Sequence, residues 1–445
     1  MAENNPIQER INQLLLKWTV AINTPNIKIV RILSEHDEED IINTFFEYML
    51  AVDTDQEDFV MVLQEPFSGH EAYSKHLLKE IEEEINQWNT AKIPENIPYK
   101  NIEWKPDYTL GSEKNVAQLL VKNLNNFANY LIPDQKTKVS IVIRMHQVGK
   151  NEACRWFEDL LEIKTAPHLV FGISDTLTNK IFDKLENRNQ KHIYTITPQL
   201  DMDAAVEQLT ALGDPNATET PYRTSLVKLM NAVKNRKKDE VQEHAKLCLT
   251  IATNELKKDS NWLTQIVTVY TILYNDQLGN KKYDKAIYFA DKAVEAALLS
   301  KKVLVPEMSN RLIGQTHVGR GALLSVQKKW ETALENYLVA NAAYIICDDY
   351  VMQSETYRLC GWACEKTGAY SEASKHYIKA YDLVHKLSPE LVKGSTFPYI
   401  LKKIINNRER SKHITDKKMD KDLIPIWGES WRTEVEKYGK MKKMA

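Results

Sequence analysis

The sequence has 445 residues, 43% hydrophobic and 27% charged, with a formal net charge of -2. This length exceeds what one hydrophobic core supports and predicts two or three globular domains. The near-neutral charge argues against a nucleic-acid binder or an anionic-membrane binder. No apolar run reaches the roughly 18 residues that a membrane span requires. No signal peptide is visible, and the five scattered cysteines suit a reducing compartment, so we expect a cytoplasmic protein.

Short apolar segments alternate with helical segments in the first half of the chain. Each predicted strand is rich in β-branched residues, and each connection between strands has helical periodicity. This pattern is typical of a parallel sheet covered by helices. We therefore predict an α/β domain with a five-stranded parallel sheet, whose strands cover residues 26–33, 59–63, 138–145, 168–173 and 192–196.

Prolines and small polar residues interrupt both periodicities at 213–222, where Pro215 and Pro221 stand. We interpret this stretch as a linker after an α/β domain at 1–212. Helical repeats are predicted for 223–407. A charged extension, poorly patterned at first and ending in a short docking helix, is predicted for 408–445.

Small and aromatic residues recur at set intervals in the helical part. Two copies of the pattern consist of Gly321, Leu324, Trp330, Ala333, Tyr337 and Ala340, and of Gly361, Cys364, Tyr370, Ala373, Tyr377 and Ala380. The pattern resembles the tetratricopeptide repeat, which implies helical hairpins with small residues at close backbone approaches and aromatics where the next hairpin caps them. The copies are further apart than the family period of roughly 34 residues, which implies lengthened helices or turns. Fainter copies at 281–297 and around Ala245 bring the expectation to about four hairpins, and an ordinary helical bundle is the alternative.

An alternating strand–helix domain before helical repeats resembles the signalling NTPases of the AAA and STAND type. The motifs that bind nucleotide in such domains are missing. Where a glycine-rich P-loop should follow the first strand, the chain has Ser34-Glu35-His36-Asp37-Glu38-Glu39-Asp40. Where a magnesium-binding carboxylate should follow the third, it has Arg144-Met145-His146. We therefore expect a P-loop-like domain without Walker motifs, without nucleotide, cofactor or catalytic residues, and not an enzyme.

A metal site is not expected either. His70, Glu71 and His76 lack the zinc-protease spacing, because Ser74 stands where the second histidine is required.

The predicted function is a non-enzymatic adaptor or chaperone that holds a partner polypeptide in the groove of its repeats. The groove is expected on the first helix of each hairpin, at Thr268, Thr271, Asn275, Leu278, Gln315, Val318, Ala322, Ser325, Glu355, Arg358, Trp362 and Glu365. Trp362 and Arg358 form a candidate hot spot. Alternatively, Trp362 packs inside the protein near Phe397 or Trp427. A structural subunit of a bacterial secretion or injection assembly, and an NTPase with an unrecognised site, remain open as other functions, and no oligomeric state is favoured.

Overall fold

The computed structural model describes residues 5–50, 58–91, 101–145, 150–214, 217–406 and 414–441. The chain divides into two compact units, Met1–Leu209 and Thr210–Ala445. This division falls within helix α7 (Met202–Ala211), and helix α8 already begins at Glu219, inside the stretch interpreted as a linker. Pro215 lies outside the described residues. That the two sides fold independently stays a prediction.

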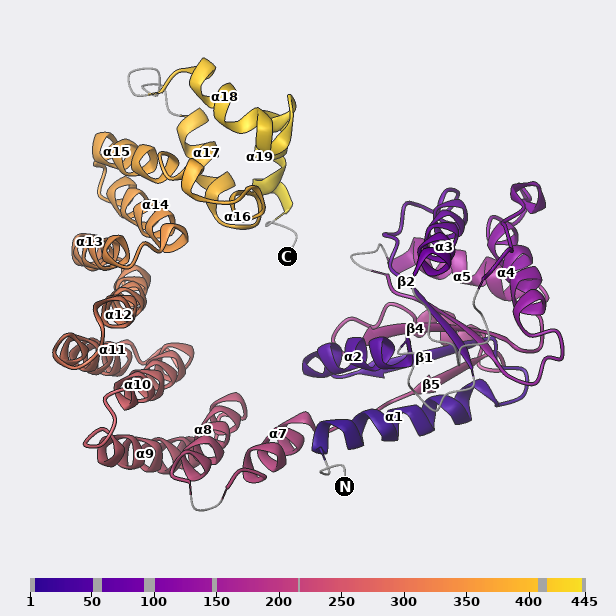
Figure 1. Cartoon of the computed structure of the whole chain (residues 1–445), viewed down its shortest axis with the longest axis horizontal. Coiled ribbons are helices and arrows are strands. Elements are labelled where there is room, and N and C mark those ends of the chain that lie inside the picture. Colours follow the sequence, from indigo (N-terminus) through magenta and orange to yellow (C-terminus); the bar gives the residue numbers. More distant parts are fainter. Residues whose placement is uncertain are drawn as a thin grey trace. The chain divides into compact units, whose positions relative to one another are not determined.

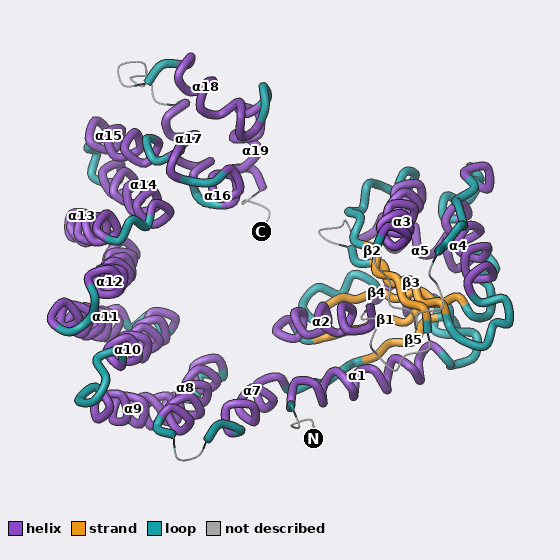
Figure 2. The backbone as a smooth tube through the Cα atoms, viewed as in Figure 1, coloured by secondary structure: helices purple, strands orange, loops and turns teal. Residues whose placement is uncertain are grey.

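The first unit is built on a parallel sheet of five strands, as the sequence predicted. The strand order is β2-β3-β4-β1-β5, and every adjacent pair is parallel. Figure 2 shows the strands side by side in orange. Their bounds are β1 (Ile29–Ser34), β2 (Phe59–Leu63), β3 (Val139–Ile143), β4 (Leu169–Thr176) and β5 (Ile193–Ile196).

Helices cover both faces of this sheet. Neighbouring residues of a strand point to opposite faces, so each strand contributes side chains to two cores. In β1, Val30 packs into a core with α1 (Pro6–Ile22) and α2 (Glu39–Leu50). Its neighbour Ile29 packs into the core of the other face. That face carries α3 (Tyr73–Thr90), α4 (Gln118–Leu131), α5 (Lys150–Glu162) and α6 (Asp183–Arg188). Figure 1 shows α1 and the α3–α4–α5 layer on opposite sides of the sheet.

The second unit is all-α and begins with stacked helix pairs, which confirms the predicted fold class. In residues 217–406, consecutive helices pair as four hairpins (Figure 1). The pairs are α8 (Glu219–Lys234) with α9 (Lys238–Glu255), α10 (Trp262–Gly279) with α11 (Tyr283–Leu299), α12 (Pro306–Val326) with α13 (Trp330–Ile346), and α14 (Tyr350–Lys366) with α15 (Tyr370–Tyr381).

The turn inside each hairpin contains one residue in the left-handed region. These residues are Arg236, Lys281, Lys328 and Gly368, with φ of 57°, 58°, 61° and 79°. In each turn the following N–H donates to a carbonyl five residues earlier, as in the Schellman motif that ends many helices. The four turns are therefore structurally equivalent, although three of them lack the glycine that usually marks such a position.

The small–aromatic pattern corresponds to a direct contact within a hairpin. A Cβ atom built on Gly321 would lie 2.6 Å from the Tyr337 ring, and one on Gly361 would lie 2.7 Å from the Tyr377 ring. Glycine is required at both positions because the tyrosine occupies the space of a side chain. The aromatic residue comes from the second helix of the same hairpin, which corrects the expectation that the next hairpin supplies this contact.

Four further helices form a separate core at the end of the chain. They are α16 (Pro389–Gly394), α17 (Phe397–Ile405), α18 (Asp416–Trp427) and α19 (Trp431–Met441), and they pack against Tyr377 and Tyr381 of α15. Helix α18 begins in the first part of the predicted extension 408–445, which seemed poorly patterned. Thr415 caps it by accepting from the N–H of Lys418, and Met419 and Leu423 bury one face. Residues 407–413 are outside the described part.

Candidate functional site

In the segment after β1, where a P-loop was sought, the acidic side chain of Glu38 accepts hydrogen bonds from the backbone. A 3₁₀ turn, η1 (His36–Glu38), leads from the strand into α2. Glu38 is buried, and its carboxylate accepts the N–H of Glu35 at 3.1 Å and the N–H of Leu200 at 2.7 Å. Backbone N–H groups at such a helix start would contact phosphate in a P-loop. Here Glu38 accepts one N–H of this helix start, that of Glu35, and a second N–H from Leu200 in the loop after β5.

The carboxyl ends of β1 and β4 form the topological switch point of the sheet, because the helices that follow them lie on opposite faces. The cavity there has a volume of only about 50 Å³. Ser34, Glu39, Arg144 and Asp175 line it, and the Arg144 guanidinium donates to the Asn43 amide oxygen at 2.6 Å. This volume holds a few waters and is far below the roughly 300–1,000 Å³ of ligand-binding pockets. His146 is outside the described residues.

A buried arginine ties β1 to its neighbours on the other face. The Arg31 guanidinium donates through Nε and Nη2 to both carboxylate oxygens of Asp175, each at 3.0 Å. It also donates to Asp183 at 2.6 Å and to Glu186, both on α6. Burial by itself lowers the pKa of Arg31, but the hydrogen bonds and charges of these carboxylates raise it above its ordinary value. Each of the three guanidinium nitrogens is engaged inside the protein, so we interpret this network as structural.

The predicted groove residues on α10 and α12 lie at different depths. Asn275, Gln315 and Ala322 are exposed. The predicted residues of intermediate exposure on these helices are Thr268, Thr271, Leu278 and Val318. Ser325 is buried, and its hydroxyl lies 3.0 Å from that of Tyr337, so its placement on an open surface was wrong.

The predicted groove residues on α14 contact other parts of the second unit. The Arg358 guanidinium donates to Glu355 at 2.6 and 2.7 Å and lies 5.4 Å from the ring centroid of Tyr399 on α17. Glu365 pairs with Lys403 of α17 at 2.6 Å. These residues therefore help to hold α17 against α14.

Trp362, the proposed centre of the hot spot, packs edge-on against Trp330 of α13. Their ring centroids are 4.9 Å apart, and the interplanar angle is 84°. This contact differs from the one with Phe397 or Trp427 that the sequence offered as an alternative. Trp362 keeps intermediate exposure, so it remains at the surface as one member of an aromatic pair.

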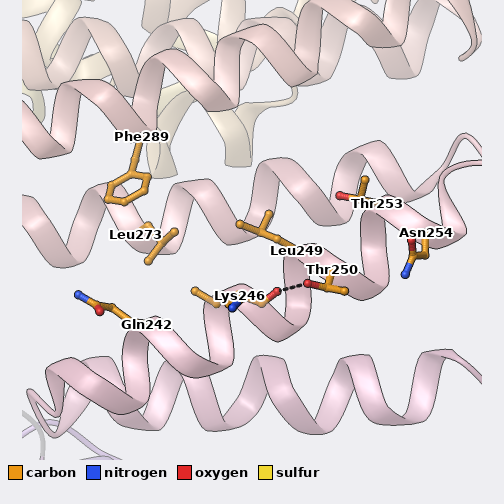
Figure 3. Close-up of a pocket in the computed structure, with 9 residues that line it drawn as sticks. Gln242, Lys246, Leu249, Thr250, Thr253, Asn254, Leu273 and Phe289 are labelled. Carbon is orange, nitrogen blue, oxygen red and sulfur yellow. Dashed lines mark hydrogen bonds between the residues drawn. The ribbon is translucent and has the colours of Figure 1, made fainter.

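A larger cavity, which the sequence did not point to, opens between α9, α10 and α11. Its volume is about 550 Å³. Ala245 and Leu249 of α9, Leu273 of α10 and Phe289 of α11 form apolar walls. The remaining lining residues belong to α9 and are Gln242, Lys246, Thr250, Thr253 and Asn254. Figure 3 shows Leu273 and Phe289 lying across the opening from Gln242 and Lys246.

The walls of this cavity are held in place by contacts outside it. Phe289 stacks on Tyr270, with ring centroids 6.5 Å apart, and contacts Tyr288 edge-on at 5.3 Å. The Thr250 hydroxyl donates to the Lys246 carbonyl at 2.8 Å, as Figure 3 shows, so it is committed to its own helix. Lys246 is exposed and has no ion pair among the described residues. The site thus offers a preformed apolar recess with one cation at its edge.

Comparison with the next hairpin explains why this space is unfilled. When the helices are aligned on their left-handed turn residues, Leu273 corresponds to Arg320 and Lys246 corresponds to Asp291. In the corresponding space between α11, α12 and α13, the Arg320 guanidinium donates to Asp291 at 2.6 Å and to Asn336 at 3.3 Å. The long Arg320 side chain occupies that space, whereas Leu273 is shorter and has no polar group, and Lys246 forms no ion pair among the described residues.

The sequence contains this difference between hairpins, but it can be recognised only when the hairpins are aligned on their turn residues. Glycine marks the turn at Gly368, whereas Arg236, Lys281 and Lys328 do not suggest a left-handed residue. Without these reference points, the exchange of Leu273 for Arg320 looks like ordinary variation along a helix.

Among the described residues, no group of three His, Cys, Asp or Glu residues is arranged to hold a metal ion. Within the same residues no helix combines the length and apolar character of a membrane span.

Comparisons with known proteins leave the family open. No protein-family model matches the sequence, and no curated protein matches it significantly. Among solved structures, the apo form of RapI is similar at 12% identity, with a TM-score of 0.33 and coverage of 98% of each chain. A Rap protein complexed with Competence and Sporulation Factor is similar at 14% identity, with a TM-score of 0.30 and coverage of 81% of this chain and 78% of that chain. A STAND protein with a tetratricopeptide repeat sensor from Pyrococcus horikoshii is similar at 11% identity, with a TM-score of 0.28, over 96% of this chain and 77% of that chain. At these TM-scores the similarities carry no argument about function.

Proposed function

We propose that this protein is a non-enzymatic binding protein whose helical array holds a partner polypeptide as an adaptor or chaperone does. The observation that carries the proposal is the apolar cavity between α9, α10 and α11. Its volume of about 550 Å³ and its apolar walls with polar side chains along α9 are those of a recognition site. Apolar side chains of the partner enter this cavity, and its polar groups bind at the α9 edge.

The exposed residues of α10 and α12 form a second candidate surface, distinct from the cavity, because Asn275 lies two positions from the cavity residue Leu273 and therefore on the opposite side of α10. Asn275, Gln315 and Ala322 present small or uncharged groups there, as a peptide-binding surface requires. The α14 residues Arg358 and Glu365 contribute by positioning α17, because both contact that helix. The groove proposed from the sequence is thereby narrowed to its α10–α12 part.

The absence of nucleotide chemistry is part of the proposal. The cavity at the sheet's switch point is about 50 Å³, and in the segment after β1 the N–H of Glu35 is already accepted by Glu38. Both features support a domain that serves as a platform rather than as an NTPase. Titration of the purified protein with ATP and magnesium tests this directly. Magnesium-dependent turnover that an Arg144→Ala variant abolishes would restore the NTPase alternative.

Crosslinking in the native cell tests the binding site. A photoreactive amino acid at Thr250 should capture a partner that one at Thr19 does not. The two positions are matched, since each is an exposed helical threonine whose hydroxyl donates to the carbonyl four residues earlier. Recovery of the same proteins from both positions would contradict the site.

The purified partner then allows a quantitative test. Thr250→Trp should fill the cavity and weaken binding about tenfold or more, which is about 1.4 kcal/mol. Thr19→Trp should leave affinity unchanged, and neither variant should lower the melting temperature appreciably. A partner that binds the array but ignores Thr250→Trp would favour the alternative of a structural subunit with a different interface.

A further inference from the structure

A second cavity lies in the first unit, at the amino ends of the strands and away from the switch point. Its volume is about 400 Å³. Three basic residues line it, and each directly precedes a strand: Lys28 before β1, Lys138 before β3 and His192 before β5. None of the lining residues is an aspartate or glutamate. The order of the strands therefore gathers basic groups from three separate parts of the chain at one edge.

Hydrogen bonds hold two of these groups in place without neutralising them. The Lys28 ammonium donates to the carbonyls of Leu161 and Ile163, both at 2.8 Å. The Lys138 ammonium donates to the carbonyl of Pro167 at 3.0 Å. A lysine ammonium has three N–H donors, so one remains on Lys28 and two remain on Lys138.

The third basic group is fixed through the backbone and its ring. The N–H groups of Lys28 and Ile29 both donate to the His192 carbonyl, which places His192 next to β1. Its ring nitrogen Nδ1 lies 3.0 Å from the carbonyl oxygen of Asn26. Nδ1 must therefore carry the proton, and Nε2 is left to interact with a ligand or to be protonated.

The charges at this edge lack partners. Within the residues that the structure describes, Lys28, Lys138 and His192 form no ion pair, and all three are of intermediate exposure. The Asp58 carboxylate is at the same edge, but it accepts the backbone N–H of Lys138 at 2.8 Å. Partial burial lowers the pKa of Lys28, as expected for an ammonium that gains carbonyls but no carboxylate. A bound anion would supply the missing charge.

We propose that this cavity binds a small molecule that carries a phosphoryl group, through Lys28, Lys138 and His192. Charge-assisted hydrogen bonds to phosphate oxygens suit these remaining donors. The volume of about 400 Å³ exceeds that of a phosphate ion and leaves room for an organic part beside Thr24 and Thr165. This site is separate from the repeat array, so it stands or falls independently of the proposed function.

Inorganic phosphate is the probe for the first test, with the full-length protein in a titration calorimeter. We expect saturable binding with a dissociation constant of about 1 mM or below. In buffer below about pH 6.5, where an ordinary imidazole carries a proton on both nitrogens, Lys138→Met and His192→Gln should each weaken binding about tenfold or more, because each removes a charge-assisted hydrogen bond. The melting temperature of each variant without phosphate should match that of the wild type, since Lys138 and His192 are not core residues.

Lys136→Met is the matched control. Lys136 is two positions from Lys138 in the same loop, is exposed, and pairs with Asp134 at 3.1 Å. Its removal should leave phosphate affinity unchanged. Absence of saturable binding by the wild type, or equal loss of affinity in Lys136→Met and Lys138→Met, would show an adventitious anion effect only. Tighter binding of malonate than of phosphate would overturn the phosphoryl assignment.

Discussion

Substitution of Gly321 by alanine tests the contact on which the hairpins depend. The new Cβ would lie 2.6 Å from Cε1, 2.9 Å from Cδ1 and 3.1 Å from Cζ of Tyr337. Carbon atoms pack best at about 3.5–4.0 Å, so the ring would have to move by about 1 Å. Tyr337 is fully buried, and its hydroxyl lies 3.0 Å from that of Ser325, so it has no free space to enter.

The net cost follows from two opposing terms. Overpacking of a close-packed core costs about 1–3 kcal/mol. Replacement of glycine by alanine inside a helix recovers about 0.5–1 kcal/mol. We therefore expect Gly321→Ala to lower the stability of the α12–α13 hairpin by about 1–2 kcal/mol. Gly361→Ala should behave alike, because its Cβ would lie 2.7 Å from the Tyr377 ring.

Native-state hydrogen exchange is the suitable assay, because it reports opening of individual helices in a chain of two units. Peptides from α12 and α13 should exchange about five- to thirtyfold faster in Gly321→Ala than in the wild type. Gly279→Ala is the control, since Gly279 ends α10 and a Cβ there meets no atom within 4 Å. That variant should be unchanged or slightly more protected. Equal protection of Gly321→Ala and Gly279→Ala would refute the close-contact reasoning.

Four further predictions concern turns, charges and thiols. Lys328→Gly should stabilise the array by about 0.5–1 kcal/mol in urea unfolding, and Gly368→Ala should destabilise it by about 1 kcal/mol, because both residues have positive φ. Arg31→Met should destabilise the first unit by about 3–5 kcal/mol, since it leaves the buried Asp175 carboxylate unpaired, and an unchanged unfolding midpoint would contradict this. Burial lowers the pKa of His317 below its unfolded value of about 6.5, so its contribution to stability is present above that pH and lost below it. His317→Gln should therefore flatten the fall in stability between pH 7.5 and 5.5, which is at most about 1.4 kcal/mol per pH unit. All five cysteines are buried, and burial raises the pKa of Cys248 to about 11, so Ellman's reagent should react slowly until denaturant is added.

The elements of the sheet could be predicted because their signal is local. The apolar run of β1 and its β-branched composition identify a strand without knowledge of its neighbours. Arg31 within that run could not be interpreted in the same way. Its three carboxylate partners come from β4 and α6, more than a hundred residues away in sequence, and only the folded sheet brings them to it.

The groove illustrates the same limit on the helical side. Helical spacing grouped Glu355, Arg358, Trp362 and Glu365 on one side of α14 and predicted a groove there. It did not reveal that α17 would contact this side. Thr396 and Lys403 donate hydrogen bonds to Glu355 and Glu365, and they are brought there by a reversal of the chain that helical spacing does not predict. Ser325 shows the finer error: a small polar residue in a helix is equally compatible with a surface and with a partner for a buried tyrosine hydroxyl.

The proposed binding site follows from a difference between repeats rather than from a motif. The hairpin turns fix the same backbone geometry at Lys281 and Lys328, so the spaces between outer helices begin as equivalents. One space is filled by Arg320, which needs both Asp291 and Asn336 as acceptors to be placed there. The other has Leu273, and within the part of the chain that the structure describes Lys246 forms no ion pair. A partner that supplies apolar side chains and an acidic group would complete in the second space what Arg320 and Asp291 complete in the first, which is why acidic amphipathic segments are the partners to seek.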